Sequence, residues 1–105
     1  MDDFRKFLSS KVKGEVRKIY DPEIPVNIVD LGLIYKIEVN AEMDCQVLMT
    51  LTAANCPAAE ILPAEVHAAA QSIDGIQNVN VDITFDPPWN PDMISEEAKF
   101  TLGIE

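Results

Sequence analysis

Residues 45–85 of the 105-residue chain contain a helical pattern between two strand patterns, and this order restricts the fold more than any other feature. Apolar residues alternate with polar ones over 45–51 and again over 79–85, which is typical of strands with one buried face. Between them, the segment 62–73 carries apolar residues at helical spacing. A strand, a helix and a strand connected in this way predict a right-handed parallel crossover.

Three further segments complete the expected order of helix, strand, strand, helix, strand and helix. Residues 4–19 carry one apolar stripe, but Ser9, Ser10 and Gly14 weaken it, so order is expected only from about Ser10, with residues 1–9 frayed. The alternation over 34–40 predicts a strand that forms a hairpin with the next one. Ser95, followed by two glutamates, predicts the start of a short last helix. We therefore expect a single compact α+β domain over residues 1–105, with a small mixed sheet packed against helices.

Two proline-containing segments depart from simple periodicity. The segment 21–32 carries two prolines and a glycine without a regular period, which predicts an ordered loop of unusual length. Such loops are often functional. Pro63 falls inside the helical segment, where proline removes a hydrogen-bond donor, so a kink or a late helix start is expected there.

Charge excludes several classes of function. The chain has 8 Lys and Arg against 18 Asp and Glu, a net charge of −10, which disfavours nucleic acid binding. The first 20 residues hold six basic and three acidic side chains, so the negative excess lies in the remainder. No apolar run reaches the about 18 residues of a membrane span, and charges interrupt any signal-peptide core. We expect a cytoplasmic protein with no membrane or nucleic acid partner.

The two cysteines are expected to remain thiols with separate roles. A strand from Cys45 to Thr52 would carry the chain about 23 Å before Cys56, whereas a disulfide needs Cα atoms within about 7 Å. Cys45 is in phase with the apolar residues of its strand, so packing is its expected role. Cys56 lies between a strand and a helix, and the partial positive charge of a helix N-terminus lowers a thiol pKa. From spacing alone, Cys56 is either a reactive thiol or a buried small hydrophobe.

Few other residues carry a chemical signature. Asp21 and Glu23, in the proline-containing loop, could accept hydrogen bonds, ligate a metal or cap a helix, and Asp30 shares this ambiguity. His67 has no partner at metal-ligand spacing. Trp89 is expected to anchor a loop on the core. Phosphate-binding and nucleophile-elbow motifs are absent from the sequence, so nucleotide hydrolysis and hydride transfer are unsupported.

Four segments together resemble the SufT-like family of metal–sulfur cluster biosynthesis proteins. They are DPEIPVNIVDLGLIY at 21–35, TAANCP at 52–57, IDGIQNVNVDITFDPPW at 73–89 and Ser95, and the resemblance extends over about residues 10–104. It implies a cytosolic accessory factor in iron–sulfur cluster assembly and in the maturation of iron–sulfur proteins. Such a factor moves or inserts clusters and is not an enzyme that turns over a metabolite.

The resemblance also assigns residues, cofactor and partners. The family's functional cysteine falls on Cys56, which would be a transient ligand of an iron–sulfur cluster. Such clusters usually need about four cysteine ligands, so either two chains share one as a homodimer or a partner supplies the rest. The implied partners are the SUF assembly machinery and apo client proteins. The implied polar surroundings of the thiol are Asp21, Glu23, Thr50, Thr52 and Asn55.

Two alternatives remain open. A non-catalytic adapter subunit for an aromatic-ring oxygenase or an assembly complex would dock through the acidic surface. The Cys-rich C-terminal extension of the phenylacetate-oxygenase branch is absent, which disfavours that branch. A thiol enzyme, such as a peroxidase, would use Cys56 but lacks a plausible resolving cysteine. The adapter predicts that Cys56→Ser is harmless, whereas the maturation factor predicts lower activity of iron–sulfur enzymes.

Overall fold

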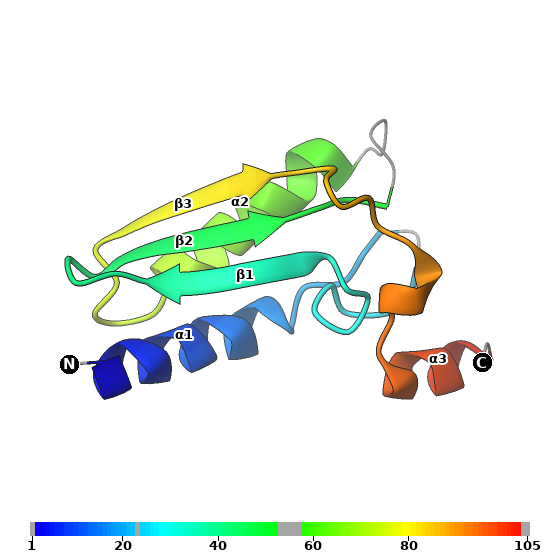
Figure 1. Cartoon of the computed structure of the whole chain (residues 1–105), viewed down its shortest axis with the longest axis horizontal. Coiled ribbons are helices and arrows are strands. Elements are labelled where there is room, and N and C mark those ends of the chain that lie inside the picture. Colours follow the sequence, from blue (N-terminus) through cyan, green and yellow to red (C-terminus); the bar gives the residue numbers. More distant parts are fainter. Residues whose placement is uncertain (1, 23, 53–57, 104–105) are drawn as a thin grey trace.

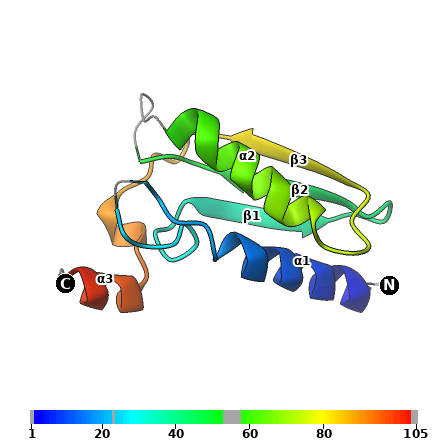
Figure 2. The same ribbon diagram turned by 180° about the vertical axis from the view of Figure 1, so that it is seen from behind.

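Helices α1 and α2 cover one face of a three-stranded sheet in the computed structural model (Figures 1 and 2). The structure describes residues 2–22, 24–52 and 58–103. Its elements are α1 (Asp2–Val16), β1 (Ile34–Val39), β2 (Asp44–Met49), α2 (Ala58–Gln71), β3 (Asn78–Ile83), the short 3-10 helix η1 (Pro91–Met93) and α3 (Glu96–Leu102). The predicted α+β class and element order are confirmed. In the described part of the chain, no helix is long and apolar enough to cross a membrane.

The sheet has the order β1–β2–β3. β1 and β2 are antiparallel, with Val39 opposite Cys45, and β2 and β3 are parallel, with Cys45 opposite Val79. Helix α2 therefore supplies the predicted parallel crossover. Because β2 and β3 run in the same direction, their C-terminal ends lie at one end of the molecule, together with the beginning of α2 (Figure 1).

The core lies between the sheet and the two long helices, and each helix contributes one apolar stripe to it. The strands contribute alternate residues, of which Val47 and Met49 are fully buried. On the opposite face of the sheet, polar side chains bond across strands, as between Gln46 Nε2 and Asp82 Oδ2 at 2.8 Å. The buried helix residues are Leu8, Val12 and Val16 of α1, and Leu62, Val66 and Ala70 of α2.

Both long helices begin earlier than expected. Helix α1 begins at Asp2 rather than near Ser10, because Leu8 is buried in the core and its packing outweighs the weak helix propensity of Ser9 and Ser10. Helix α2 begins at Ala58 and contains Pro63, so the expected late start is wrong. Burial of side chains on both sides of Pro63 offsets the backbone hydrogen bond that proline removes.

The last two strands end earlier than the alternation predicts. β2 ends at Met49, although the backbone N–H of Thr50 still donates to the Leu33 carbonyl in the register of the pairing with β1. β3 ends at Ile83, and the apolar face of this edge strand is only partly covered. Ile83 is 37% exposed and Phe85, beyond the strand, is 45% exposed.

Candidate functional site

The candidate residues come from two segments at one end of the molecule. The loop 21–32 and the segment that follows β2 both lie at the end where α2 begins (Figure 1). Asp21, Thr50 and Thr52 belong to the described residues, so their surroundings can be stated. Glu23, Asn55 and Cys56 lie outside the described residues.

Thr50 is fully buried directly after β2. Its backbone N–H donates to the carbonyl of Leu33 at 2.8 Å, whereas its side-chain Oγ1 has no hydrogen-bond partner among the described residues. Leaving a buried hydroxyl without a partner costs about 1–3 kcal/mol. Thr52, two positions further along, is half-buried. Because the Thr50 hydroxyl lowers the stability of the fold in this way, its presence requires an explanation other than stability.

Removing the Thr50 hydroxyl is expected to stabilise the fold. Thr50→Val keeps the shape of the side chain and should raise the free energy of unfolding by about 1 kcal/mol, because no hydrogen bond to a described residue is lost. Thr50→Ser keeps the hydroxyl, deletes a buried methyl group and should lower the free energy by about 1 kcal/mol. Urea unfolding of the two variants measures both effects. A lower stability of Thr50→Val would show that the hydroxyl has a partner after all.

Asp21 is nearly buried, at 6% exposed, and shapes the beginning of the long loop. Its Oδ1 accepts a hydrogen bond from the backbone N–H of Ile24 at 3.0 Å. Its own N–H donates to the carbonyl of Val26. This is the turn-forming role that is usual for aspartate in such loops, and it fixes the backbone on both sides of position 23.

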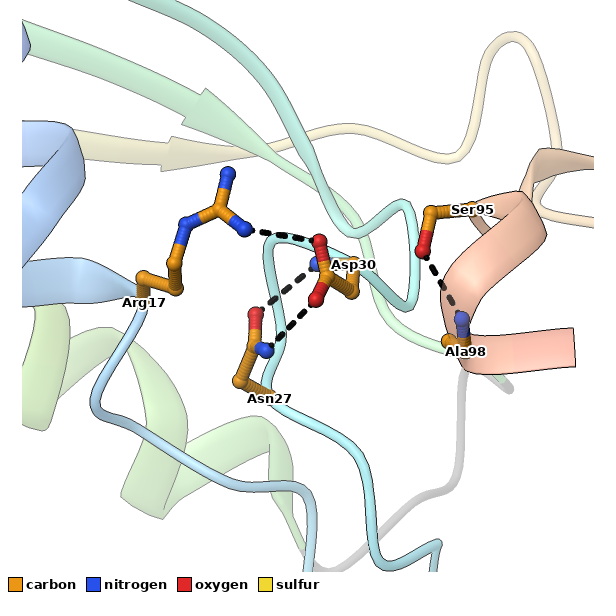
Figure 3. Close-up of polar contacts among 5 residues, drawn as sticks. All are labelled: Arg17, Asn27, Asp30, Ser95 and Ala98. Atoms are coloured by element: carbon orange, nitrogen blue, oxygen red, sulfur yellow. Dashed lines mark hydrogen bonds and ion pairs between the residues drawn. The ribbon is translucent and has the colours of Figure 1, made fainter. Parts of the chain in front are cut away.

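Asp30 anchors the other half of the loop and is a structural residue (Figure 3). Arg17 Nη1 donates to Asp30 Oδ1 at 3.0 Å, and Asn27 Nδ2 donates to Asp30 Oδ2 at 2.9 Å. The backbone N–H of Asp30 donates to Asn27 Oδ1 at 2.9 Å. Both carboxylate oxygens are therefore engaged. The sequence reasoning missed Arg17 and Asn27, although an Asn three residues before an Asp is a recognisable turn signal.

The same loop is tied to α3 through Ser95. The Ser95 N–H donates to the Asp30 carbonyl at 2.7 Å, while Ser95 Oγ accepts from the N–H of Ala98 at 3.2 Å (Figure 3). Ser95 is thus the N-cap of α3, as predicted, and Gly103 is its C-cap. The predicted anchoring role of Trp89 is confirmed, because its Nε1 donates to the carbonyl of Leu31 at 2.8 Å. The loop 21–32 is therefore held at both ends and in its middle.

Cys45 is buried, at 1% exposed, and packs in the core as expected. Burial disfavours the thiolate and raises the pKa of the Cys45 thiol above its ordinary value. The side chain is consequently an uncharged core residue at neutral pH. It provides no accessible thiolate for metal chemistry.

Raising the pH should destabilise the fold through Cys45. In the unfolded chain the Cys45 thiol has its ordinary pKa of about 8.5, whereas in the folded protein the pKa is higher. Between these pKa values the unfolded chain binds fewer protons, so the free energy of unfolding falls as the pH rises. Urea unfolding at about pH 7.5 and about pH 10 should show a smaller fall for Cys45→Ala, which lacks the titrating group. An equal fall in both proteins would contradict this assignment.

The described residues contain no group of three or more His, Cys, Asp or Glu side chains that could hold a metal ion. His67 is exposed on α2. The described part of the candidate site is therefore a structured loop beside a buried, unpartnered hydroxyl.

Comparison with known proteins places the chain in a family. Residues 9–83 match the family model described as iron-sulfur cluster assembly protein. A relative from Porphyromonas gingivalis, named Fe-S protein maturation auxiliary factor, is 52% identical over 89 residues, which cover 85% of each chain. The Fe-S protein maturation auxiliary factor SufT from Staphylococcus aureus is 42% identical over 86 residues, covering 82% of this chain and 98% of the relative.

A solved structure agrees with this placement. The crystal structure of a domain of unknown function from Bacillus anthracis matches with a TM-score of 0.91 and 26% identity, over the full length of both chains. The family model covers the second half of α1, the loop 21–32 and the crossover β2–α2–β3, and therefore the elements that position the candidate site. The chain belongs to the SufT-like family of iron–sulfur cluster assembly proteins.

Proposed function

We propose that this protein is an accessory factor in the maturation of iron–sulfur proteins and that Cys56 is the thiol that contacts the cluster. The observation that carries this proposal is the family match together with relatives named Fe-S protein maturation auxiliary factor. The cluster is the cargo of the protein, which passes it on, and no metabolite is turned over.

The chemistry of Cys56 suits this task. Thiolates are soft ligands that bind the iron of such clusters. Helix α2 begins at Ala58, shortly after Cys56 in the sequence, and a helix N-terminus favours the thiolate over the thiol. In a transfer step, the Cys56 thiolate replaces one cysteine ligand of the donor, and that ligand leaves and takes up a proton. A client cysteine then replaces Cys56 in the same way.

Ligand count makes the contact transient. A cluster usually needs about four cysteine ligands, and the chain has two cysteines. Cys45 is buried in the core and is not available as a second ligand. The remaining ligands must come from the donor, from the client or from Cys56 of a second copy.

Thr50 and Asp21 act as positioning residues in this proposal. Thr50 follows β2 directly and carries a hydroxyl that has no partner among the described residues, and the carboxylate of Asp21 holds the beginning of the loop 21–32. The hydroxyl is available to hydrogen-bond the thiolate or a cluster sulfide. This use would explain why a buried hydroxyl with no partner among the described residues is kept.

Gene deletion with complementation tests the proposal in cells. Deletion should lower the activity and the cluster content of iron–sulfur enzymes, and the native gene should restore both. Cys56→Ser should fail to restore them, whereas Cys45→Ala, which removes only the core thiol, should succeed. Full restoration by Cys56→Ser would contradict a role of this thiol and would favour an adapter that docks without metal chemistry.

A further inference from the structure

A groove runs along the boundary between α1 and the edge strand β1. It consists of two cavities of about 310 Å³ and about 530 Å³, which share Ser9, Ser10 and Ile37 as lining residues and are therefore continuous. Helix α1 and β1 are in contact and lie side by side in Figures 1 and 2. None of the described candidate residues, Asp21, Asp30, Thr50 and Thr52, lines this groove.

The groove has the opposite charge to the rest of the protein. Its lining contains Arg5, Lys6, Lys13 and Lys36, which are half of the 8 Lys and Arg in a chain of net charge −10. Among the described residues, the only carboxylate in the lining is Glu38, and its Oε1 lies 3.2 Å from Lys36 Nζ. A concave surface lined by one sign of charge concentrates the field and attracts ligands of the other sign.

The shape of the groove suits an extended chain segment. β1 has six residues, so its length is about 20 Å at about 3.3 Å per residue. The lining also contains the partly exposed apolar side chains of Val29, Ile34 and Ile37. A small-molecule site would enclose most of its ligand, whereas this groove is open along one side. A segment with alternating acidic and apolar side chains would match both features.

We propose that this groove docks an acidic, extended segment of a partner protein. The carboxylates of the segment pair with Lys6, Lys13 and Lys36, and its apolar side chains cover Ile37 and Val29. The groove uses no described residue of the candidate site, and its argument does not involve Cys56. A partner held here leaves the end of the molecule that carries Thr50 open to a second protein.

Charge reversal within the groove tests this surface. The probe is a fluorescein-labelled peptide of about ten alternating glutamate and valine residues, long enough to span β1, and its binding is measured by anisotropy at low ionic strength. The native protein should bind it despite its own net negative charge, and added salt should weaken binding. The double variant Lys6→Glu with Lys13→Glu should weaken binding at least about tenfold, because it reverses charges that line the groove.

A matched control separates the groove from overall charge. Lys11→Glu with Lys18→Glu changes the net charge equally, but Lys11 lies over the ring of Phe7 and Lys18 pairs with Glu15. This variant should weaken binding less than about twofold, since rim and remote charges contribute little. Equal weakening by both double variants would overturn the proposal, as would the absence of peptide binding to the native protein. Tighter binding of tripolyphosphate than of the peptide would also overturn it and would identify a phosphate site.

Discussion

Gly32→Ala is expected to lower the free energy of unfolding by about 2–5 kcal/mol, since the added Cβ meets both backbone strain and a steric clash. Gly32 has a φ of 88°, in the left-handed region that side chains disfavour. A Cβ at this position would lie 2.6 Å from the carbonyl oxygen of Met93 and 2.8 Å from its Cβ. This contact packs the loop 21–32 against η1, so the loop or η1 must move to admit the methyl group.

Gly14→Ala is the matched control for this substitution. Gly14 lies within α1, and a Cβ there would have nothing within 4 Å. Its replacement should stabilise the protein by about 0.5–1 kcal/mol, because glycine weakens a helix interior. Urea unfolding of the two variants should therefore shift in opposite directions. A stability change below about 1 kcal/mol for Gly32→Ala would contradict the close packing of the loop on η1.

The order of the elements could be predicted because it depends on local patterns. The alternation around Val47 and Val81 and the cap at Ser95 each appear within a few residues of sequence, and each is present in the structure. The parallel crossover then follows from topology alone. The predicted starts of α1 and α2 were wrong because Leu8 and Leu62 are buried in the core. Their burial depends on packing between segments far apart in the sequence, which local helix propensity does not describe.

The functional features depended on contacts that the sequence does not display. Asp30 looked like a candidate ligand, yet both of its oxygens are engaged by Arg17 and Asn27. Nothing in the residue pattern shows that the Thr50 hydroxyl has no partner among the described residues. The basic groove also arises only on folding, when Lys36 of β1 comes beside Lys13 of α1. The identity of the thiol came from the resemblance, and Cys56 lies outside the described residues.

Cys56→Ser is expected to abolish the contribution of this protein to cluster transfer. Serine keeps the size of the side chain, but its hydroxyl does not ionise near neutral pH and is a poor ligand for the iron of a cluster. The effect should therefore be a fall to the rate seen without the protein, with little change in stability. Thr50→Val should lower the rate by a smaller factor, because it removes a positioning hydroxyl and leaves the thiolate in place.

The most direct measurement is the rate at which a purified apo iron–sulfur dehydratase regains activity from a cluster-loaded donor under anaerobic conditions. The native protein and Cys45→Ala are expected to accelerate this activation, whereas Cys56→Ser should leave it at the rate of the donor alone. Circular dichroism in the far ultraviolet confirms that each variant is folded. Equal acceleration by the native protein and by folded Cys56→Ser would contradict the central claim that this thiol carries the cluster.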